Sequence, residues 1–122
     1  MSKDELIWAA GFFDGEGTIG PNLSSKNFSN VPCIRLGLSQ VDRRPLDRFC
    51  EAVNVGTVQG PHVHAKKSYS EYYTWKVAGM KAIQVLILIE PWLSQPKSEQ
   101  AIQEIAKVAM IRGSMKWGRQ FV

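Results

Sequence analysis

The sequence predicts an α+β domain in which helices cover one face of an antiparallel sheet. Segments with strand character occur in two pairs, and helical segments lie before, between and after these pairs, in the order α-β-β-α-β-β-α-α. A length of 122 residues, with 44% hydrophobic and 21% charged residues, fits one globular domain with a modest core. We therefore expect residues 1–122 to form a single domain.

The first expected element is a short amphipathic helix that begins near Asp4 and ends at Glu16. We expect Gly17 to end this helix in the left-handed conformation. Gly11 and Gly15 lie four residues apart and would let another backbone approach closely. The residues that can form its apolar side are Leu6, Ile7, Ala10, Gly11 and Phe13.

Two hairpins and three more helices are expected to follow. The clearest strand spans residues 31–41, because apolar residues alternate along it with polar or small ones. Asp42 can cap the next helix, and Pro91 ends the apolar helix that precedes the last one. The remaining expected elements are strands at 18–28, 55–63 and 69–78 and helices at 43–54, 80–90 and 98–112. On the last helix, the residues expected to face inward are Ile102, Ile105, Ala106 and Ala109.

One face of the expected sheet is polar, and two interpretations of it remain open. Antiparallel sheets commonly have one solvated face. Alternatively, a polar strand pair fits the major groove of DNA, where amide, hydroxyl and guanidinium groups read base edges. The net charge of +4 and the pI of about 9.2 permit a polyanionic partner. The candidate DNA-binding residues on this face are Asn22, Ser24, Lys26, Arg35, Ser39, Gln59, Thr74 and Lys76.

Residues 10–17 read Ala-Gly-Phe-Phe-Asp-Gly-Glu-Gly, and they place an acidic residue at the end of the first helix. A carboxylate at a helix C-terminus is disfavoured by the helix dipole, and a divalent cation would reverse that penalty. The stretch resembles the nine-residue signature of the LAGLIDADG homing endonucleases, which aligns with residues 9–17 without a gap. Ala9 stands in place of the opening leucine, and Glu16 in place of the last aspartate. The matching letters are Ala10, Gly11, Asp14 and Gly17. Without the resemblance, the same stretch is a helix that ends at a glycine.

The resemblance implies an αββαββα domain with a four-stranded, saddle-shaped antiparallel sheet and helices on one face. It also implies a catalytic metal site at Glu16 and Gly15. Gln40 stands where the family has a polar residue that helps to order the attacking water, and Lys97 stands near the family's basic active-site residue. Gln40 can also be a strand-end residue turned to solvent, and Lys97 can be an ordinary solvated lysine. Pro96 departs from the family pattern and leaves the alignment open by one residue.

A single copy of the signature predicts that the partner is a second identical chain. Pairing two copies of the first helix would bring two Glu16 carboxylates together. The expected interface residues are Ile7, Ala10, Gly11, Asp14 and Gly15.

The predicted function is that of an intron-encoded nuclease which cuts double-stranded DNA at a long palindromic or pseudo-palindromic site. The expected cofactor is Mg²⁺ or Mn²⁺, and Ca²⁺ is expected to support binding without cleavage. Neither a membrane nor a small-molecule substrate is expected. The alternative is a DNA-binding regulator or intron-splicing maturase that uses the same scaffold without cutting.

Several other residues carry weaker signals. Arg43 and Arg44 follow Gln40 and could touch either phosphate or the active-site water. His62 and His64 lie two apart beside lysines, where contact with the DNA backbone or plain solvent exposure is favoured over metal binding. Residues 115–121 mix basic and aromatic groups that could pack on the body or contact DNA.

The remaining observations concern the cellular compartment. Two cysteines without metal spacing indicate free, buried thiols in a reducing environment. The apolar stretch 83–89 is too short to span a bilayer. Because no signal or transit peptide is visible, we expect an intracellular protein.

Overall fold

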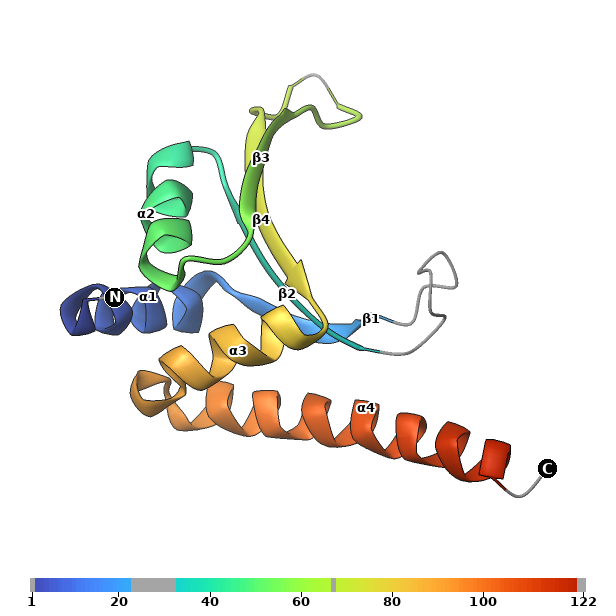
Figure 1. Cartoon of the computed structure of the whole chain (residues 1–122). Coiled ribbons are helices and arrows are strands. Elements are labelled where there is room, and N and C mark those ends of the chain that lie inside the picture. The colour runs from blue at the N-terminus through green and yellow to red at the C-terminus, as the bar shows by residue number, and fades with distance from the viewer. Residues whose placement is uncertain (1, 23–32, 67, 121–122) are drawn as a thin grey trace.

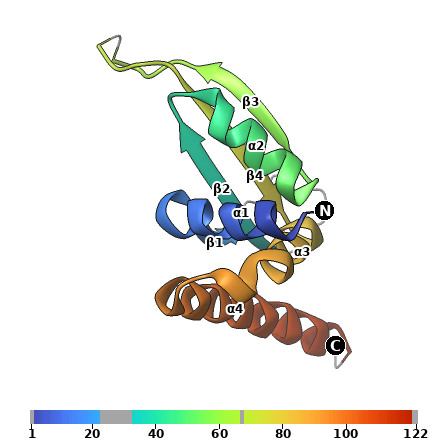
Figure 2. The same cartoon turned by 90° about the vertical axis from the view of Figure 1, so that its left-hand side faces the viewer.

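The computed structural model describes residues 2–22, 33–66 and 68–120, and the side chains of these residues except 22 and 111–120. In this part of the chain, four strands form one antiparallel sheet in the order β1-β2-β4-β3, and four α-helices cover one of its faces (Figure 1). Figure 2 shows α1 lying across the strands, with α2 next to it. The α+β prediction is therefore confirmed. The elements are α1 (Lys3–Glu16), β1 (Thr18–Asn22), β2 (Cys33–Gln40), α2 (Arg43–Val53), β3 (Thr57–His62), β4 (Tyr72–Ala78), α3 (Met80–Ile89), a 3₁₀ turn (Glu90–Trp92) and α4 (Gln95–Gln120).

Helix α1 begins and ends where the sequence predicts, but it ends by a different device. The Ser2 hydroxyl accepts a hydrogen bond from the Glu5 backbone N–H and caps the first turn. Gly17 is extended, with φ of −79° and ψ of 151°, so the expected left-handed stop is wrong. A glycine is needed there for another reason, because a Cβ atom would collide with the Phe13 ring.

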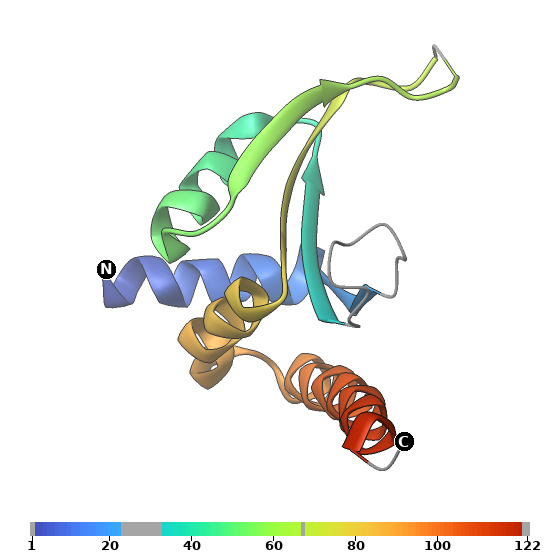
Figure 3. The ribbon, with the colours of Figure 1, turned by 45° about the vertical axis from the view of Figure 1, so that its right-hand side comes forward.

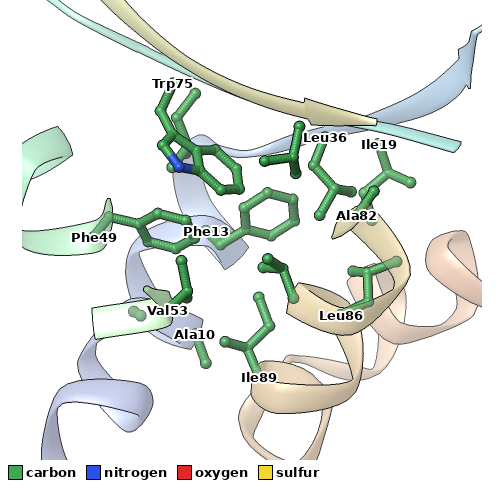
Figure 4. Close-up of a cluster of buried hydrophobic side chains, with 14 of the residues drawn as sticks. Ala10, Phe13, Ile19, Leu36, Phe49, Val53, Trp75, Ala82, Leu86 and Ile89 are labelled. Carbon is green, nitrogen blue, oxygen red and sulfur yellow. The ribbon is translucent and has the colours of Figure 1, made fainter. Parts of the chain in front are cut away.

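An aromatic cluster lies at the centre of the core, between α1, α2 and the sheet (Figure 4). The Phe49 ring meets Trp75 edge-on at 4.7 Å between centroids, and Phe13 stacks against Phe49 at 6.1 Å. The Trp75 indole N–H donates to the Val55 carbonyl at 2.9 Å, so this polar group is buried with a partner. The alternation predicted for β2 is confirmed, because Ile34, Leu36 and Leu38 are buried while Arg35 and Ser39 are exposed.

Helix α2 is held by the residue that precedes it and by α1, which packs beside it. Asp42 caps it as predicted, since its carboxylate accepts from the Arg44 backbone N–H at 2.9 Å. Arg48 reaches across to α1, where it donates to both carboxylate oxygens of Glu5 at 2.8 and 2.9 Å. The same guanidinium lies 4.0 Å from the centroid of the Trp8 ring, which adds a cation–π contact.

Helix α4 differs most from its prediction. It begins at Gln95, three residues early, and Pro96 lies in the first turn, where a missing N–H costs nothing. The helix continues to Gln120 instead of ending near residue 112. Of the residues expected to face inward, Ile102 is 62% exposed and Ala106 and Ala109 are exposed, and only Ile105 is partly buried. The buried positions are Ala101 and Val108.

The phase of α4 is set by polar contacts with the strand next to it. The Lys97 ammonium donates to the Gly17 carbonyl at 2.8 Å, and the Gln100 amide donates to the Ile19 carbonyl at 3.5 Å. These contacts turn the Lys97–Gln100 side of the helix inward, and Ala101 and Val108 lie on that side. Ile102 is consequently rotated toward solvent.

The first hairpin is described only in part. Strand β1 ends at Asn22, and residues 23–28 of the expected strand lie outside the described residues. In the second hairpin, β3 and β4 fall within the predicted segments 55–63 and 69–78. Among the described helices, none is both long and apolar enough to cross a bilayer.

Candidate active site and nucleic-acid interface

Glu16 is the last residue of α1, and its side chain is exposed where the helix meets the first hairpin. The Gln40 amide Nε2 lies 3.3 Å from Glu16 Oε2 and donates a hydrogen bond to it. Gln40 shares the parity of the core-facing residues of β2, so its side chain points to the helix side of the sheet, and it is only half-buried because the strand ends there. The two predicted catalytic residues are therefore neighbours, while the role of Gln40 in ordering water stays a prediction.

Lys97 joins the same end of α1 from the far end of the chain. Its ammonium donates to the Gly17 carbonyl at 2.8 Å, one residue past Glu16, and lies 5.8 Å from the centroid of the Phe13 ring. Although Pro96 leaves the alignment with the family open by one residue, the structure places Lys97 itself next to the end of α1. Gln40 contacts the Glu16 side chain, and Lys97 contacts the carbonyl of the next residue, so segments far apart in the sequence come together at the end of α1. The electrostatic role of Lys97 stays a prediction.

Asp14 has a partner within its own chain. Its Oδ1 accepts a hydrogen bond from the Ser94 backbone N–H at 2.8 Å, immediately before α4. Hydrogen bonds from Ser94 hold the pKa of Asp14 below its usual value, and the positive charge of Lys97 acts in the same direction. Asp14 was predicted as a dimer-interface residue, whereas the structure uses its carboxylate between α1 and α4.

The donor atoms at the end of α1 suit a hard divalent cation. The last carbonyls of a helix lack intrahelical partners, and the Gly15 carbonyl belongs to this group. Together with the exposed Glu16 carboxylate, it offers oxygen ligands of the kind magnesium prefers. The described residues contain no cluster of three or more His, Cys, Asp or Glu side chains that could hold a metal.

The uncovered face of the sheet carries the predicted polar residues. Arg35, Ser39, Gln59 and Lys76 are all exposed. The register places Lys76 opposite Gly37, and it places both Ser39 and Gln59 opposite Thr74, so these residues share one face. Figure 3 shows this face curving between the β3–β4 hairpin and β1 with no helix over it. The side of the sheet was correctly predicted, and contact with DNA stays a prediction.

A hollow of about 370 Å³ connects the end of α1 with this polar face. Its lining includes Glu16 together with Arg35 and Lys76. Gly37 has no side chain to crowd the hollow. A Cβ at this position would lie 3.2 Å from the Thr18 hydroxyl, which is a tight contact. Thr18 and Gly37 were not predicted as site residues; the place of Gly37 in the alternation of β2 was the available signal. The full lining is Glu16, Thr18, Arg35, Gly37, Leu38, Ser39 and Lys76.

Thr74 is a correction to the predicted DNA-binding set. Its side chain lies on the polar face, yet it is only 5% exposed. The His62 imidazole Nε2 lies 2.9 Å from its hydroxyl and forms a hydrogen bond with it. Ser24 and Lys26 lie outside the described residues. Asn22 ends β1, and its side chain is likewise not described.

Arg43 and Arg44 form the first turn of α2, and each pairs with a carboxylate near it. Arg43 Nε lies 3.1 Å from Asp47 Oδ1, and Arg44 Nε lies 3.0 Å from Asp42 Oδ1. Hydrogen bonds from the side chain and backbone of Arg44 lower the pKa of Asp42 to about 2. Arg43 also lines a hollow of about 680 Å³ between α2 and β3, to which Glu16 does not contribute. The choice between a phosphate and a water contact stays open for both arginines.

The histidines of the second hairpin pack on tyrosines. The His64 ring lies 4.7 Å from Tyr72 and 5.3 Å from Tyr69, and the His62 ring lies 5.1 Å from Tyr72. Neither histidine belongs to a metal-binding group among the described residues. The cysteines, Cys33 and Cys50, are free and half-buried rather than fully buried. In the C-terminal segment 115–121, only the helical backbone through residue 120 is described.

The predicted dimer face of α1 is uncovered at Ile7, Gly11 and Gly15, but not at Ala10 or Asp14. Ile7 is 40% exposed, and an added Cβ at Gly11 or Gly15 would meet nothing within 4 Å in the described chain. Ala10 is fully buried in the core cluster of its own subunit (Figure 4), so it cannot contribute to an exposed interface. Helical spacing predicts that Ala10 and Ile7 share the apolar side of α1, but it does not predict which of them the rest of the chain covers.

Comparisons with known proteins find similarity in structure alone. No family model matches the sequence, and curated proteins include no significant relative. The chain is similar to the homing endonuclease I-CvuI, with a TM-score of 0.67 and 19% identity over 88% of this chain and 67% of that one. I-CvuI was solved in complex with DNA in the presence of magnesium and, separately, with its target in the presence of calcium.

Two other solved structures give the same picture. The homing endonuclease I-TnaI matches at a TM-score of 0.60 and 18% identity over 96% of this chain and 77% of that one. The LAGLIDADG homing endonuclease I-GzeII, bound to its DNA target, matches at 0.64 and 18% over 94% of this chain and 39% of that one. The chain thus spans about two thirds of I-CvuI and less than half of I-GzeII. At identities this low, the matches show a shared fold and nothing more specific.

Proposed function

Because this chain has the fold of the LAGLIDADG homing endonucleases, we propose that it is a sequence-specific double-strand DNA endonuclease that acts as a homodimer with magnesium. The observation that carries the proposal is the meeting of Glu16, Gln40 and Lys97 at the end of α1. Of these residues, Glu16 also lines a hollow that opens onto an uncovered polar sheet face. A carboxylate, an amide and an ammonium group beside such a face can serve metal-assisted phosphodiester hydrolysis as metal ligand, water contact and positive charge.

Each side chain has a part in the proposed reaction. Glu16 and the Gly15 carbonyl would hold a magnesium ion, which when bound would supply neutralisation of phosphate charge and activation of water. Gln40 fixes the Glu16 carboxylate through its Nε2 and can accept a hydrogen bond from the attacking water through its Oε1. Lys97 brings a positive charge to the Glu16–Gly17 end of α1, where it stabilises the negative charge that develops on the phosphate.

The homodimer follows from the small ligand set and the uncovered face of α1. One chain offers a single carboxylate at the end of the helix, and two cuts require two sites. Pairing two α1 helices through Ile7, Gly11 and Gly15 would bring both Glu16 residues under one continuous polar surface. The close approach needs glycine, since larger side chains would hold the backbones apart.

The polar face is the proposed DNA-reading surface. The eight residues of β2 span about 26 Å, somewhat less than one turn of B-DNA. Two subunits would therefore read a two-fold symmetric site of nearly two turns. Arg35 is the best candidate for a bidentate contact with guanine, because it is exposed and lines the hollow. An intracellular location next to DNA is part of the same proposal.

Selection of cleavage sites from a randomised double-stranded library tests this function directly. Wild-type protein with magnesium should enrich cut ends that share one palindromic or pseudo-palindromic sequence. With calcium it should retain the same sequence uncut. A chain that binds duplex DNA in a salt-dependent manner but never cuts would favour the regulator or maturase alternative. A chain that neither binds nor cuts would contradict both.

A further inference from the structure

The position of Lys97 depends on where the first turn of α4 lies. Lys97 is the third residue of α4, and its ammonium reaches the Gly17 carbonyl at 2.8 Å. A lysine side chain is long and flexible, so one hydrogen bond to the end of a helix would not by itself hold it in place. Something must therefore fix the backbone of this turn against the end of α1.

Asp14 makes that connection. Its Oδ1 accepts from the backbone N–H of Ser94, the residue just before α4, at 2.8 Å. The N-terminal N–H groups of a helix lack intrahelical acceptors and carry partial positive charge, so a carboxylate there is stabilising. Pro96 removes one N–H from this turn, which leaves fewer donors by which it can be held. Asp14 lies two residues before Glu16, and Ser94 lies three residues before Lys97.

This use of Asp14 distinguishes it from the uncovered residues of α1. Gly11 and Gly15 have open space around them, whereas Asp14 is half-buried and already bonded within the chain. The first turn of α4 has a second contact, since the Ser98 hydroxyl donates to Glu90 Oε1 at 3.3 Å. That contact joins α4 to the preceding 3₁₀ turn rather than to α1. The Ser98–Glu90 contact therefore fixes the first turn of α4 without reference to α1, whereas the Asp14–Ser94 contact fixes it against the end of α1 that carries Glu16.

We infer that Asp14 is a positioning residue that fixes the first turn of α4 on the end of α1 and thereby holds the Lys97 ammonium beside Glu16. It acts through Lys97 and does not itself touch the reacting phosphate. The inference rests on the proposed function only for its effect on cutting; the placement of Lys97 can be measured without any activity.

The kinetic test compares Asp14→Ala, which removes the acceptor, with Asp14→Asn, which keeps a neutral one. Single-turnover cutting at saturating protein should fall roughly 100-fold in Asp14→Ala, close to the loss in Lys97→Met, and less in Asp14→Asn. Calcium-supported DNA affinity should stay within a few-fold. The double variant Asp14→Ala/Lys97→Met should cut no slower than Lys97→Met alone, because both changes remove one interaction. Ser98→Ala, the matched control on the same turn, should cut at close to the wild-type rate.

The structural test uses amide hydrogen exchange at Ser94 and the NMR shift of the Lys97 Nζ. Both should change in Asp14→Ala and remain near wild type in Ser98→Ala. Unchanged exchange at Ser94, losses that multiply in the double variant, or an Asp14→Asn as slow as Asp14→Ala would each overturn the inference. If Asp14→Ala does not fold, Asp14→Asn still decides, because it keeps an acceptor for the Ser94 N–H: cutting as slow as in Lys97→Met together with wild-type exchange at Ser94 would contradict the role. A wild-type chain that cuts no DNA would remove the proposed function, while altered Ser94 exchange would still support the placement of Lys97.

Discussion

The two faces of α1 have opposite surroundings, although both are made of small and apolar residues. On one face, Ala9, Ala10 and Phe13 are fully buried in the core of their own chain. On the other, Ile7 is exposed, and no described residue lies within 4 Å of a Cβ added at Gly11 or Gly15. The face with Ile7, Gly11 and Gly15 would be buried only if another molecule covered it. The core face therefore serves folding, whereas the glycine face is available for a partner.

The largest effect is expected on the buried face. Phe13→Ala removes a ring that packs against Phe49 and leaves a cavity, so unfolding free energy should fall by about 3–5 kcal/mol. Ile7→Ala on the other face should cost much less in a monomer, because Ile7 is 40% exposed. Urea denaturation of both variants at low protein concentration measures the difference. Equal losses would show that the two faces do not differ as described.

A smaller effect on folding, but a large one on assembly, is expected on the glycine face. Gly15→Leu and Gly11→Leu add side chains where the chain itself leaves open space, so the monomer should keep its stability to within about 1 kcal/mol. The same side chains should separate paired helices and shift sedimentation from dimer to monomer. Cutting should fall with assembly. A wild-type chain that stays monomeric on its DNA at micromolar concentration would contradict the homodimer.

The smallest effect concerns the ion pair at the edge of the buried face. The hydrogen bond from Arg48 holds the pKa of Glu5 below its usual value, so the pair stabilises the fold at neutral pH. This contribution is complete above the unfolded pKa of Glu and is lost as the pH falls through the lowered folded pKa. Thermal stability measured from pH 7 to 3 should therefore fall less in Arg48→Met than in wild type. Parallel pH curves would show that the pair contributes nothing.

Most of the fold follows from sequence patterns that local physics sets. The Asp42 cap, the alternation along β2 and the end of α1 at Glu16 each depend on neighbouring residues, and each was predicted. The phase of α4 was not, because Ile102, Ala106 and Ala109 have helical spacing too. Contacts from Lys97 and Gln100 to the backbone of Gly17 and Ile19 select the other side.

The candidate site divides in the same way. The family resemblance and the parity of Gln40 in β2 predict that Glu16 and Gln40 belong to one site. In the structure the two side chains are hydrogen-bonded. The acceptor role of Asp14 could not be predicted, because its partner Ser94 is 80 residues away. The burial of Thr74 was also missed, since alternation assigns a side chain to a face but does not reveal that His62 lies over it.

Replacing Glu16 by glutamine is the most direct test of the proposed function. Glu16→Gln keeps the size of the side chain and can still hydrogen-bond Gln40, but it removes the charge that would hold the metal. Single-turnover cutting of the selected DNA site in magnesium should be lost, while calcium-independent DNA binding should be kept or become tighter, because repulsion of the phosphate disappears. A Glu16→Gln protein that cuts at close to the wild-type rate would contradict the account.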